Sequence, residues 1–301
     1  MRIGVAATPE VAIPTMEWLL HYGHELSLVI SQPDRAAGRG LELKASPVSL
    51  WAIGKGIPLL RPESPTELIE AVSDLDLVLT IGYGVLLPQE ILDLPRHGFI
   101  NLHFSLLPAY RGAAPVQRAI EHGESITGVT VFQLDKGMDT GPIYSSATLE
   151  IAPEWRTSEL MEVLSTMGPQ VVKEALTAIE KLKPPTPQAG SSSLAPKISK
   201  NEAKILWSDS ARTTLNRIRA FFPAPVAWSL FRGDSFKITS AELSYAAVNP
   251  GEIAVIDSDV VVGCGEGTAI SLLTVVPAGK KEMDAKDWAR GARLSRGELL
   301  G

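Results

Sequence analysis

The sequence predicts an α/β protein with two domains: a Rossmann-like domain built on a parallel sheet, and a smaller C-terminal β-barrel of the OB-like kind. Apolar strand-like segments alternate with helical segments early in the chain, as in parallel sheets covered by helices. The composition then changes to prolines and serines at residues 183–193, which is typical of a linker. Closely spaced short strands beyond it favour a small barrel. We therefore expect domains over residues 1–182 and 206–301, joined by a linker over residues 183–205.

The first domain is predicted to begin with a βαβ unit. Residues 2–8 and 25–31 form its strands, and residues 10–22 form a helix that ends at Gly23. Further strands and intervening helices complete the sheet: strands at 76–81, 99–104 and 128–134, and helices near 63–73 and 114–122. This alternation predicts strands that run parallel and are covered on both faces.

A long amphipathic pattern over Thr157–Lys181 follows, and Gly168-Pro169 is expected to interrupt this helix. The second domain is expected to begin with a helix over Ser210–Phe221, capped by Ser208 or Asp209. Its short strands are predicted at 227–231, 235–238, 251–256, 260–262 and 268–275.

The composition describes an ordinary globular chain of 301 residues, of which 45% are apolar and 21% charged. No uncharged apolar run approaches the roughly 20 residues that cross a membrane, and the chain starts like a strand rather than a signal peptide. A cytoplasmic protein is therefore expected. One cysteine, Cys264, excludes an internal disulfide, and five scattered histidines predict no metal site. The net charge of −6 argues against a polyanionic partner unless basic residues gather on one face.

Two common enzyme classes are disfavoured by the absence of their motifs. Ala6-Ala-Thr-Pro-Glu-Val follows the first strand, where a dinucleotide-binding domain needs Gly-x-Gly-x-x-Gly. A Gly-x-Ser-x-Gly nucleophile motif is also missing, and Cys264 lies in a glycine-rich segment that is typical of a hairpin turn. NAD-dependent chemistry and hydrolysis through a Ser or Cys nucleophile are therefore not expected.

Two polar side chains occupy one face of a predicted apolar strand. Alternation points Asn101 and His103 to the face opposite Ile100 and Leu102. Burying either polar group unpaired costs on the order of 1–3 kcal/mol, which favours a functional role for both. Asp139 follows the next strand, and if the two strands are neighbours the three side chains converge. This convergence makes a candidate active site.

An imidazole can exchange a proton near neutral pH, and an amide N–H can stabilise a developing oxyanion. The trio therefore fits acyl transfer without a covalent intermediate. Taken singly, a strand histidine is more often a core residue, and Asp139 between two glycines is more often a turn residue. Arg111 is open to three interpretations: it caps a helix end, pairs with an acid or binds substrate.

Motifs from one end of the chain to the other resemble the folate-dependent formyltransferase family. They are Gln32–Gly40, Gly82-Tyr-Gly84-Val-Leu-Leu-Pro88, Asn101-Leu-His103, Ser105-Leu-Leu-Pro108, Arg111-Gly-Ala-Ala-Pro115, Asp135-Lys-Gly-Met-Asp139-Thr-Gly141, Lys197-Ile-Ser-Lys200 and Pro277–Met283. The resemblance implies transfer of the formyl group of 10-formyltetrahydrofolate to the α-amine of methionine on initiator methionyl-tRNA.

The resemblance also implies roles for individual residues. Asn101, His103 and Asp139 are the catalytic trio. The folate co-substrate lies along two segments: Ser105, Leu106, Leu107 and Pro108, and Gly82, Tyr83, Gly84, Val85 and Leu86. The tRNA is contacted by basic residues of both domains: Arg35, Arg39, Lys44, Lys280 and Lys281. No metal is implied, and a monomer is the default expectation.

Two other functions stay open. A formyltransferase acting on another amine, such as a sugar nucleotide or glycinamide ribonucleotide, would use the same trio, because the trio specifies only the chemistry. A non-catalytic folate-binding or RNA-binding relative is disfavoured by the intact trio. Ala6-Ala7, Phe104 and Ala224 depart from residues that are usual in the family. These departures are expected to affect substrate binding more than they affect the catalytic trio.

Overall fold

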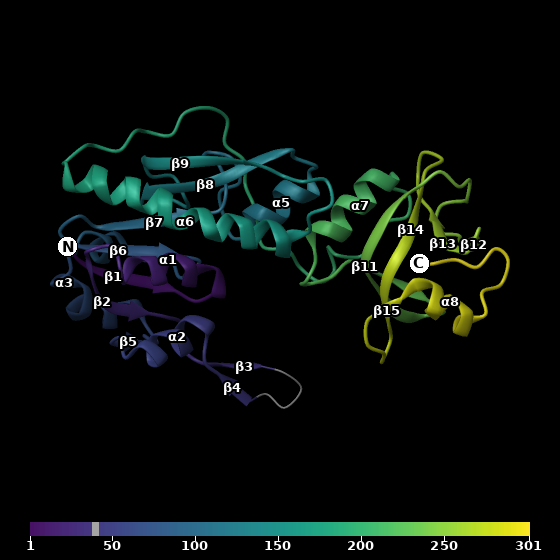
Figure 1. The fold of residues 1–301 in the computed structure, drawn as a ribbon, viewed down its shortest axis with the longest axis horizontal. Coiled ribbons are helices and arrows are strands. Elements are labelled where there is room, and N and C mark those ends of the chain that lie inside the picture. Colours follow the sequence, from purple (N-terminus) through teal and green to yellow (C-terminus); the bar gives the residue numbers. More distant parts are fainter. Residues whose placement is uncertain (38–41) are drawn as a thin grey trace. The chain divides into compact units, whose positions relative to one another are not determined.

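The computed structural model describes residues 1–37 and 42–301, which form two compact units (Figure 1). The first unit consists of Met1–Pro115, Ile126–Glu150 and Met161–Pro196. The second consists of Val116–Ser125, Ile151–Leu160 and Lys197–Gly301. No helix within the described part of the chain is both long and apolar enough to cross a membrane.

A seven-stranded sheet forms the centre of the first unit, in the order β5-β2-β1-β6-β7-β8-β9. Its strands are β1 (Arg2–Ala7), β2 (Glu25–Ile30), β5 (Leu59–Leu60), β6 (Leu77–Ile81), β7 (Phe99–His103), β8 (Ile126–Gln133) and β9 (Ile143–Glu150). The first five strands in this order pair in parallel, which confirms the Rossmann-like prediction. The expected parallel placement of β8 is wrong, because β8 pairs antiparallel with both β7 and β9.

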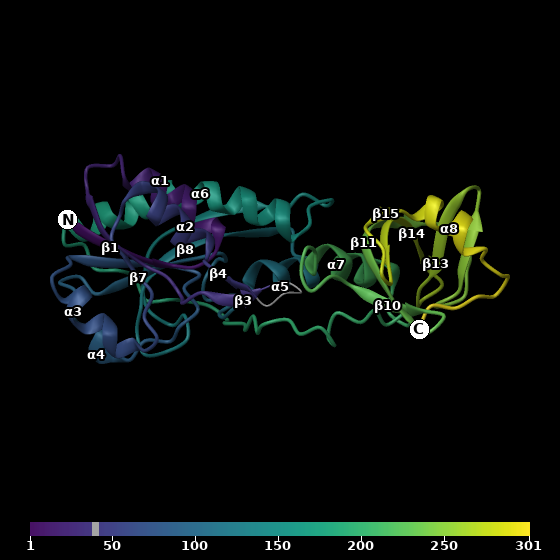
Figure 2. The ribbon, with the colours of Figure 1, turned by 90° about the horizontal axis from the view of Figure 1, so that it is seen from below.

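The sheet is buried because helices cover both of its faces. Figure 2 shows α1 (Ile13–Leu19) and α6 (Thr157–Glu180) on one side, and α3 (Leu68–Ser73) and α4 (Gln89–Leu92) on the other. All five residues of β6 are buried, as expected for a strand packed on both faces. The remaining elements that lie wholly in this unit are η1 (Glu10–Ala12), β3 (Arg35–Ala37), β4 (Glu42–Lys44), α2 (Pro47–Lys55) and η2 (Pro65–Glu67).

Helix α6 is continuous through Gly168-Pro169, so the predicted interruption is wrong. Its close packing against the sheet explains why glycine is needed there. A Cβ at Gly168 would lie 2.4 Å from Thr15 Oγ1 and 2.9 Å from Leu102 Cδ2. The helix therefore lies directly against α1 and β7, and burial of its apolar face outweighs the local cost of the proline.

Replacing Gly168 with alanine is expected to lower the free energy of unfolding by about 1–3 kcal/mol, because the added methyl overpacks this contact. Gly54→Ala in α2 is the matched control, since a Cβ at Gly54 meets no atom within 4 Å apart from its chain neighbours and the backbone of its own helix. In that control the alanine raises the helix propensity and creates no overpacked contact, so the free energy of unfolding should not fall. Urea unfolding of both variants measures the difference, and equal stabilities would contradict the close packing at Gly168.

The second unit contains an antiparallel sheet, in the order β10-β11-β14-β13-β12, with β15 paired to β14. Its strands are β10 (Trp228–Phe231), β11 (Asp234–Ser244), β12 (Ile253–Ile256), β13 (Asp259–Gly263), β14 (Ala269–Pro277) and β15 (Met283–Asp284). Near the C-terminus, Leu299 bridges to Glu252 and Leu300 bridges to Phe231. The C-terminal residues thus bridge the edge strand β10 and the residue just before the edge strand β12, which closes the sheet and confirms the predicted small barrel.

Two helices accompany the barrel strands. Helix α7 (Ala211–Ala220) begins after Ser210, whose side chain accepts a hydrogen bond from the Thr213 amide, so the predicted caps Ser208 and Asp209 are wrong. Helix α8 (Ala285–Ala292) was not predicted. Its Trp288 packs on Phe236 with ring centroids 4.4 Å apart. Helix α5 (Pro115–Glu121) also lies mainly in this unit.

An ion pair at the start of α6, within the second unit, makes its stability depend on pH. Arg156 Nη2 lies 2.6 Å from Glu159 Oε1, and hydrogen bonds from Arg156 lower the pKa of Glu159 to about 2. Because the folded carboxyl has the lower pKa, the pair stabilises the protein above the unfolded pKa of roughly 4.3. That contribution is lost as the pH falls toward 2. The Glu159 side chain is 38% exposed, so screening by solvent reduces the contribution to about 1 kcal/mol.

We expect Glu159→Gln to unfold about 1 kcal/mol more easily than the parent near neutral pH. The amide still accepts a hydrogen bond but carries no charge. The difference should shrink as the pH falls below about 4, because the unfolded parent then takes up a proton at this carboxyl, whereas the folded parent does so only near pH 2. Urea unfolding of both proteins across this pH range measures it. A difference that stays constant down to the lowest pH at which both proteins fold would refute the charge-based explanation.

Candidate active site

His103 is the last residue of β7, and its side chain is buried within the first unit. Its Nε2 lies 2.9 Å from the carbonyl oxygen of Tyr110. Because a carbonyl oxygen can only accept, Nε2 carries a hydrogen and donates it. Nδ1 is therefore the ring nitrogen that faces Asp139, with 3.8 Å between Nδ1 and Oδ2. This distance exceeds that of a hydrogen bond, so Nδ1 keeps the capacity to exchange a proton with a bound group.

Asp139 reaches His103 by a route that the sequence did not predict. Gln133 at the end of β8 pairs with Ile100 at the start of β7, so β8 ends far from His103. The loop after β8 must fold back to bring Asp139 to the imidazole. Within this loop a Cβ at Gly141 would lie 1.8 Å from the Gln133 carbonyl oxygen, so only glycine fits. The predicted convergence of His103 and Asp139 is thus observed, although it does not arise from parallel strand ends.

The Asp139 carboxylate is held by the segment that follows β7. The amide of Gly112 donates to Oδ2 over 2.7 Å. Asp139 itself has a φ of 54°, and Tyr110 has a φ of 60°. Such left-handed backbone costs a non-glycine residue on the order of 1–3 kcal/mol and persists where surrounding contacts enforce it. Strained backbone on both sides of the imidazole is typical of a functional site.

Asn101 lies two residues before His103, on the same face of β7. Thr80 Oγ1 in β6 donates to Asn101 Oδ1 over 2.7 Å. This bond fixes the orientation of the carboxamide and leaves Nδ2 as the end that can donate to a ligand. The structure therefore places all three predicted catalytic residues in the first unit, with His103 and Asp139 adjacent and Asn101 beside them on the strand.

The first predicted folate segment, Ser105–Pro108, is anchored by its own polar groups. Ser105 Oγ donates to the Ala109 carbonyl over 2.6 Å. Thr130 Oγ1 donates to the Ser105 carbonyl over 2.7 Å and accepts from the Leu107 amide over 3.2 Å. The Leu107–Pro108 peptide is cis. Because the Ser105 and Leu107 side chains are buried, a ligand beside this segment would meet mainly its backbone and the half-buried side chains of Leu106 and Pro108.

The second predicted folate segment, Gly82–Leu86, borders an open cavity of about 360 Å³. Both glycines adopt positive φ, and the Tyr83 carbonyl accepts hydrogen bonds from Thr8 Oγ1 and Gln32 Nε2. The Tyr83 ring is buried, which raises the pKa of its hydroxyl, while Leu86 is 77% exposed. The cavity wall consists of Gln32, Pro33, Asp34, Arg35, Pro62, Glu63, Ser64, Pro65, Tyr83 and Val85.

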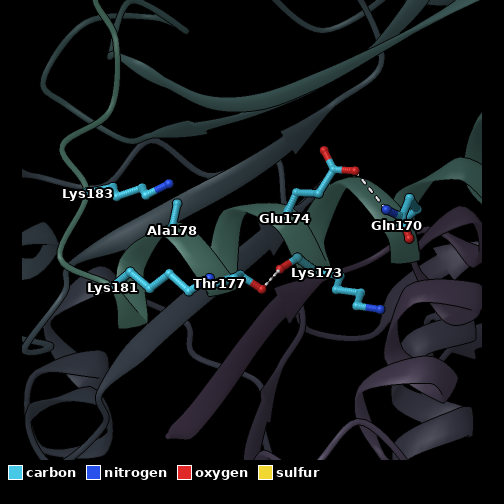
Figure 3. Close-up of a pocket in the computed structure, with 7 residues that line it drawn as sticks. All are labelled: Gln170, Lys173, Glu174, Thr177, Ala178, Lys181 and Lys183. Carbon is cyan, nitrogen blue, oxygen red and sulfur yellow. Dashed lines mark hydrogen bonds between the residues drawn. The ribbon is translucent and has the colours of Figure 1, made fainter.

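A second hollow of about 210 Å³ lies along α6 and contains no predicted site residue (Figure 3). Its walls are Gln170, Lys173, Glu174, Thr177, Ala178, Lys181 and Lys183. Hydrogen bonds there stay within the helix, from Gln170 Nε2 to Glu174 Oε1 and from Thr177 Oγ1 to the Lys173 carbonyl. One helix and two residues beyond its end, Lys181 and Lys183, supply this wall, so it lacks the convergence of elements seen around His103.

The predicted tRNA-contacting residues lie in both units. Arg35 in β3 pairs with Lys44 in β4, and both side chains are exposed. Arg35 Nη2 donates to Gln32 Oε1. Arg39 lies outside the described residues. Lys280 and Lys281 are exposed after β14 in the second unit.

Sequence reasoning missed Gln188, whose amide is the partner of Arg111. Arg111 Nη2 donates to Gln188 Oε1 over 2.6 Å. The expected alternatives for Arg111 were a helix end, an acid or a substrate, and an amide from the proline-rich segment was not among them. The roles of Thr80 and Thr130 were also missed, since they depend on hydrogen bonds to segments distant in the sequence.

Comparisons with known proteins identify the family of this chain. Residues 7–176 match the family model of the formyl transferases, and residues 197–293 match the model of the formyl transferase C-terminal domain. The chain belongs to the formyl transferase family. The predicted family is thereby confirmed.

Relatives within the family extend over the whole chain. The methionyl-tRNA formyltransferase of Salinispora tropica is 42% identical over 100% of both chains. That of Nocardioides sp. is 43% identical over 100% of this chain and 98% of its own. The N-formyltransferase from Helicobacter canadensis, solved with folinic acid and dTDP-3-aminofucose, has a TM-score of 0.68 at 19% identity and covers 90% of this chain and 98% of that chain. At this identity the structural likeness shows the fold alone.

For a formyl transferase, the observed geometry supplies the groups that acyl transfer needs. The Asn101 amide can donate to an oxygen that gains negative charge, and His103 Nδ1 can exchange a proton beside the Asp139 carboxylate. The family is folate-dependent. Among residues 1–37 and 42–301, no three His, Cys, Asp or Glu side chains are grouped so as to hold a metal ion.

Proposed function

We propose that this protein transfers the formyl group of 10-formyltetrahydrofolate to the α-amine of methionine on initiator methionyl-tRNA, for translation initiation. The arrangement of His103 Nδ1 opposite Asp139 Oδ2 at 3.8 Å, beside Asn101, carries the chemical part of the proposal. Similarity to methionyl-tRNA formyltransferases over the full length of both chains supports the tRNA as acceptor. Both domains of the chain are then used, residues 1–182 for catalysis and residues 206–301 for tRNA.

The folate co-substrate supplies an activated formyl group. In the reaction the amine nitrogen forms a bond to the formyl carbon, the bond from that carbon to N10 of the folate breaks, and N10 receives a proton as the amine loses one. Asn101 Nδ2 donates to the formyl oxygen as it gains negative charge, and protonated His103 can do the same. His103 Nδ1 takes the proton that the amine loses and passes a proton to N10, and Asp139 stabilises the imidazolium that forms in between.

The segments Ser105–Pro108 and Gly82–Leu86 are the proposed folate contacts. Their positive-φ glycines and anchored carbonyls present backbone groups with little charge, which suits a flat pterin. The exposed side chains of Val85 and Leu86 can cover an apolar surface of the ligand. We further propose that Arg35, Arg39, Lys44, Lys280 and Lys281 contact tRNA phosphates, and that the protein acts as a cytoplasmic monomer without a metal ion.

An assay with three alternative acceptors tests the proposed function. The purified protein is incubated with 10-formyltetrahydrofolate labelled in the formyl carbon, together with initiator methionyl-tRNA, an amino-sugar nucleotide or glycinamide ribonucleotide. We expect label on the methionyl-tRNA and at most traces on the two small amines. Label on a small amine alone would replace the proposed acceptor, and absence of transfer to all three would indicate a binding protein instead.

A further inference from the structure

Gln188 lies in residues 183–196, a segment of the first unit that follows α6 and contains no helix or strand of its own. Its carboxamide lies between two loops. Nε2 donates to the carbonyl oxygens of Asp139 and Gly141 over 2.9 and 2.8 Å. Oε1 accepts from Nε and Nη2 of Arg111 over 3.2 and 2.6 Å. One half-buried side chain thus makes four hydrogen bonds to two separate loops.

The chemistry of the partners determines how this amide is oriented. Backbone carbonyl oxygens can only accept, and a guanidinium group can only donate. The Nε2 end must therefore face Asp139 and Gly141, and the Oε1 end must face Arg111. A side chain with only donors or only acceptors could satisfy one of these loops but not both.

Both loops that Gln188 joins contain groups that position His103 or Asp139. Residues 110–112 hold the Tyr110 carbonyl that fixes His103 Nε2 and the Gly112 amide that donates to Asp139 Oδ2. Residues 139–141 hold the carboxylate itself. The backbone at Asp139 is left-handed and would relax if its surroundings allowed it. Hydrogen bonds to the carbonyls of Asp139 and Gly141 therefore act on the strained part of the loop.

The rest of the segment is held without Gln188. Thr186 and Ile143 exchange two backbone hydrogen bonds of 2.8 and 2.7 Å. Ala195 donates to the Arg111 carbonyl over 2.6 Å, and Ser193 Oγ accepts from the Tyr110 amide over 2.9 Å. Losing the Gln188 side chain should therefore free the Asp139 loop while the segment stays in place.

We propose that Gln188 is a positioning residue for formyl transfer, which holds the Asp139 carboxylate opposite His103 by joining loops 110–112 and 139–141. The proposal rests on the proposed function, because it assumes that Asp139 acts in the reaction. Gln188 acts through Asp139 and Arg111 and is not itself assigned a contact with the reacting groups.

Two variants separate the two ends of the amide. Gln188→Ala removes all four hydrogen bonds. Gln188→Glu has nearly the same shape and still accepts from Arg111, but it loses both donors and sets a negative charge against two carbonyl oxygens. Thr186→Ala is the matched control, because Thr186 is exposed and pairs with Ile143 only through its backbone. Initial rates with initiator methionyl-tRNA give kcat and KM, and thermal unfolding checks the fold.

Both Gln188 variants are expected to lose about 10–100-fold in kcat, the size of the effect seen when groups that orient the ligands of a catalytic metal are removed. KM for the tRNA should stay within about twofold, and Thr186→Ala should match the parent. Parent-like kcat in Gln188→Glu would overturn the proposal, since the donors to the Asp139 loop would then be unimportant. An equal loss in Thr186→Ala would also overturn it, because the segment as a whole would be responsible.

A double-mutant cycle tests whether Gln188 works through Asp139. Residues that act as one unit have non-additive effects, so Gln188→Ala should change kcat little when Asp139 is already asparagine. A full additional 10–100-fold loss in that background would refute the positioning role. Failure of the proposed function looks different, because the parent protein itself would then give no formyl-methionyl-tRNA.

Discussion

Replacing His103 with glutamine is expected to lower kcat for formyl transfer by about 10²–10⁴-fold, the range that a positioned acid or base contributes. In the structure His103 Nε2 donates to the Tyr110 carbonyl, and Nδ1 faces Asp139 across 3.8 Å. A glutamine can keep an N–H near the position of Nε2 and so satisfy the carbonyl. It has no nitrogen that takes up a proton near neutral pH. The substitution therefore removes the chemistry with little change in packing.

Alanine at the same position should lose as much activity and also some stability, because it leaves the Tyr110 carbonyl without this donor. His21→Ala is the control, since His21 is exposed on the first unit and apart from the site. Its kcat should equal that of the parent. Steady-state rates and thermal unfolding of the three variants separate the two effects. Near-normal kcat in a folded His103→Gln protein would remove His103 from the mechanism.

Asn101→Ala is expected to lower kcat by about 10²–10³-fold, the usual loss when one donor to an oxyanion is removed. Thr80 Oγ1 donates to Asn101 Oδ1, so the amide presents its Nδ2 end to the substrate. Asn101→Asp keeps the size of the side chain but places an acceptor where charge develops. It should lose at least as much activity as alanine.

Thr80→Val tests how much the orientation of the Asn101 amide contributes to kcat. It keeps Asn101 but removes the hydroxyl that orients it, so kcat should fall by about tenfold, the equivalent of one ordinary hydrogen bond. Rates measured at saturating folate and tRNA distinguish these losses from weaker binding. If Asn101→Ala kept the parent kcat and raised only KM, Asn101 would be a binding residue and not a stabiliser of the reacting group.

Four of the five parallel strands, β1, β2, β6 and β7, were predictable because burial on both faces demands nearly continuous apolar residues. The fifth, β5, was missed because it has only two residues. All of β6 is buried, and in β7 only Asn101 is left half-exposed. Alternation along β7 also placed Asn101 and His103 together on one face. The direction of β8 was not predictable in this way, since alternation has the same pattern in a parallel and an antiparallel strand. The edge strand β9 was missed because its side chains are small, polar or partly exposed.

The candidate site was also predictable only in part. Residue types and motifs indicated the chemistry. They did not show how Asp139 reaches His103, because the strand before Asp139, β8, ends beside the start of β7 and His103 lies at the end of β7. Gln188 was hidden by its context, because a run of prolines and serines indicates a linker and says nothing about which polar groups it bonds. Its role follows only from four distances to Arg111, Asp139 and Gly141.

The most direct test is the single-turnover rate of formyl transfer from 10-formyltetrahydrofolate to initiator methionyl-tRNA, for the parent protein and for Asp139→Asn. With enzyme in excess over tRNA, this rate reports the chemical step without product release. We expect the parent to place the formyl group on the α-amine of methionine, and Asp139→Asn to do so about 10²–10⁴-fold more slowly with unchanged tRNA binding. Equal rates in the two proteins, or no transfer by the parent, would contradict formyl transfer at His103 and Asp139.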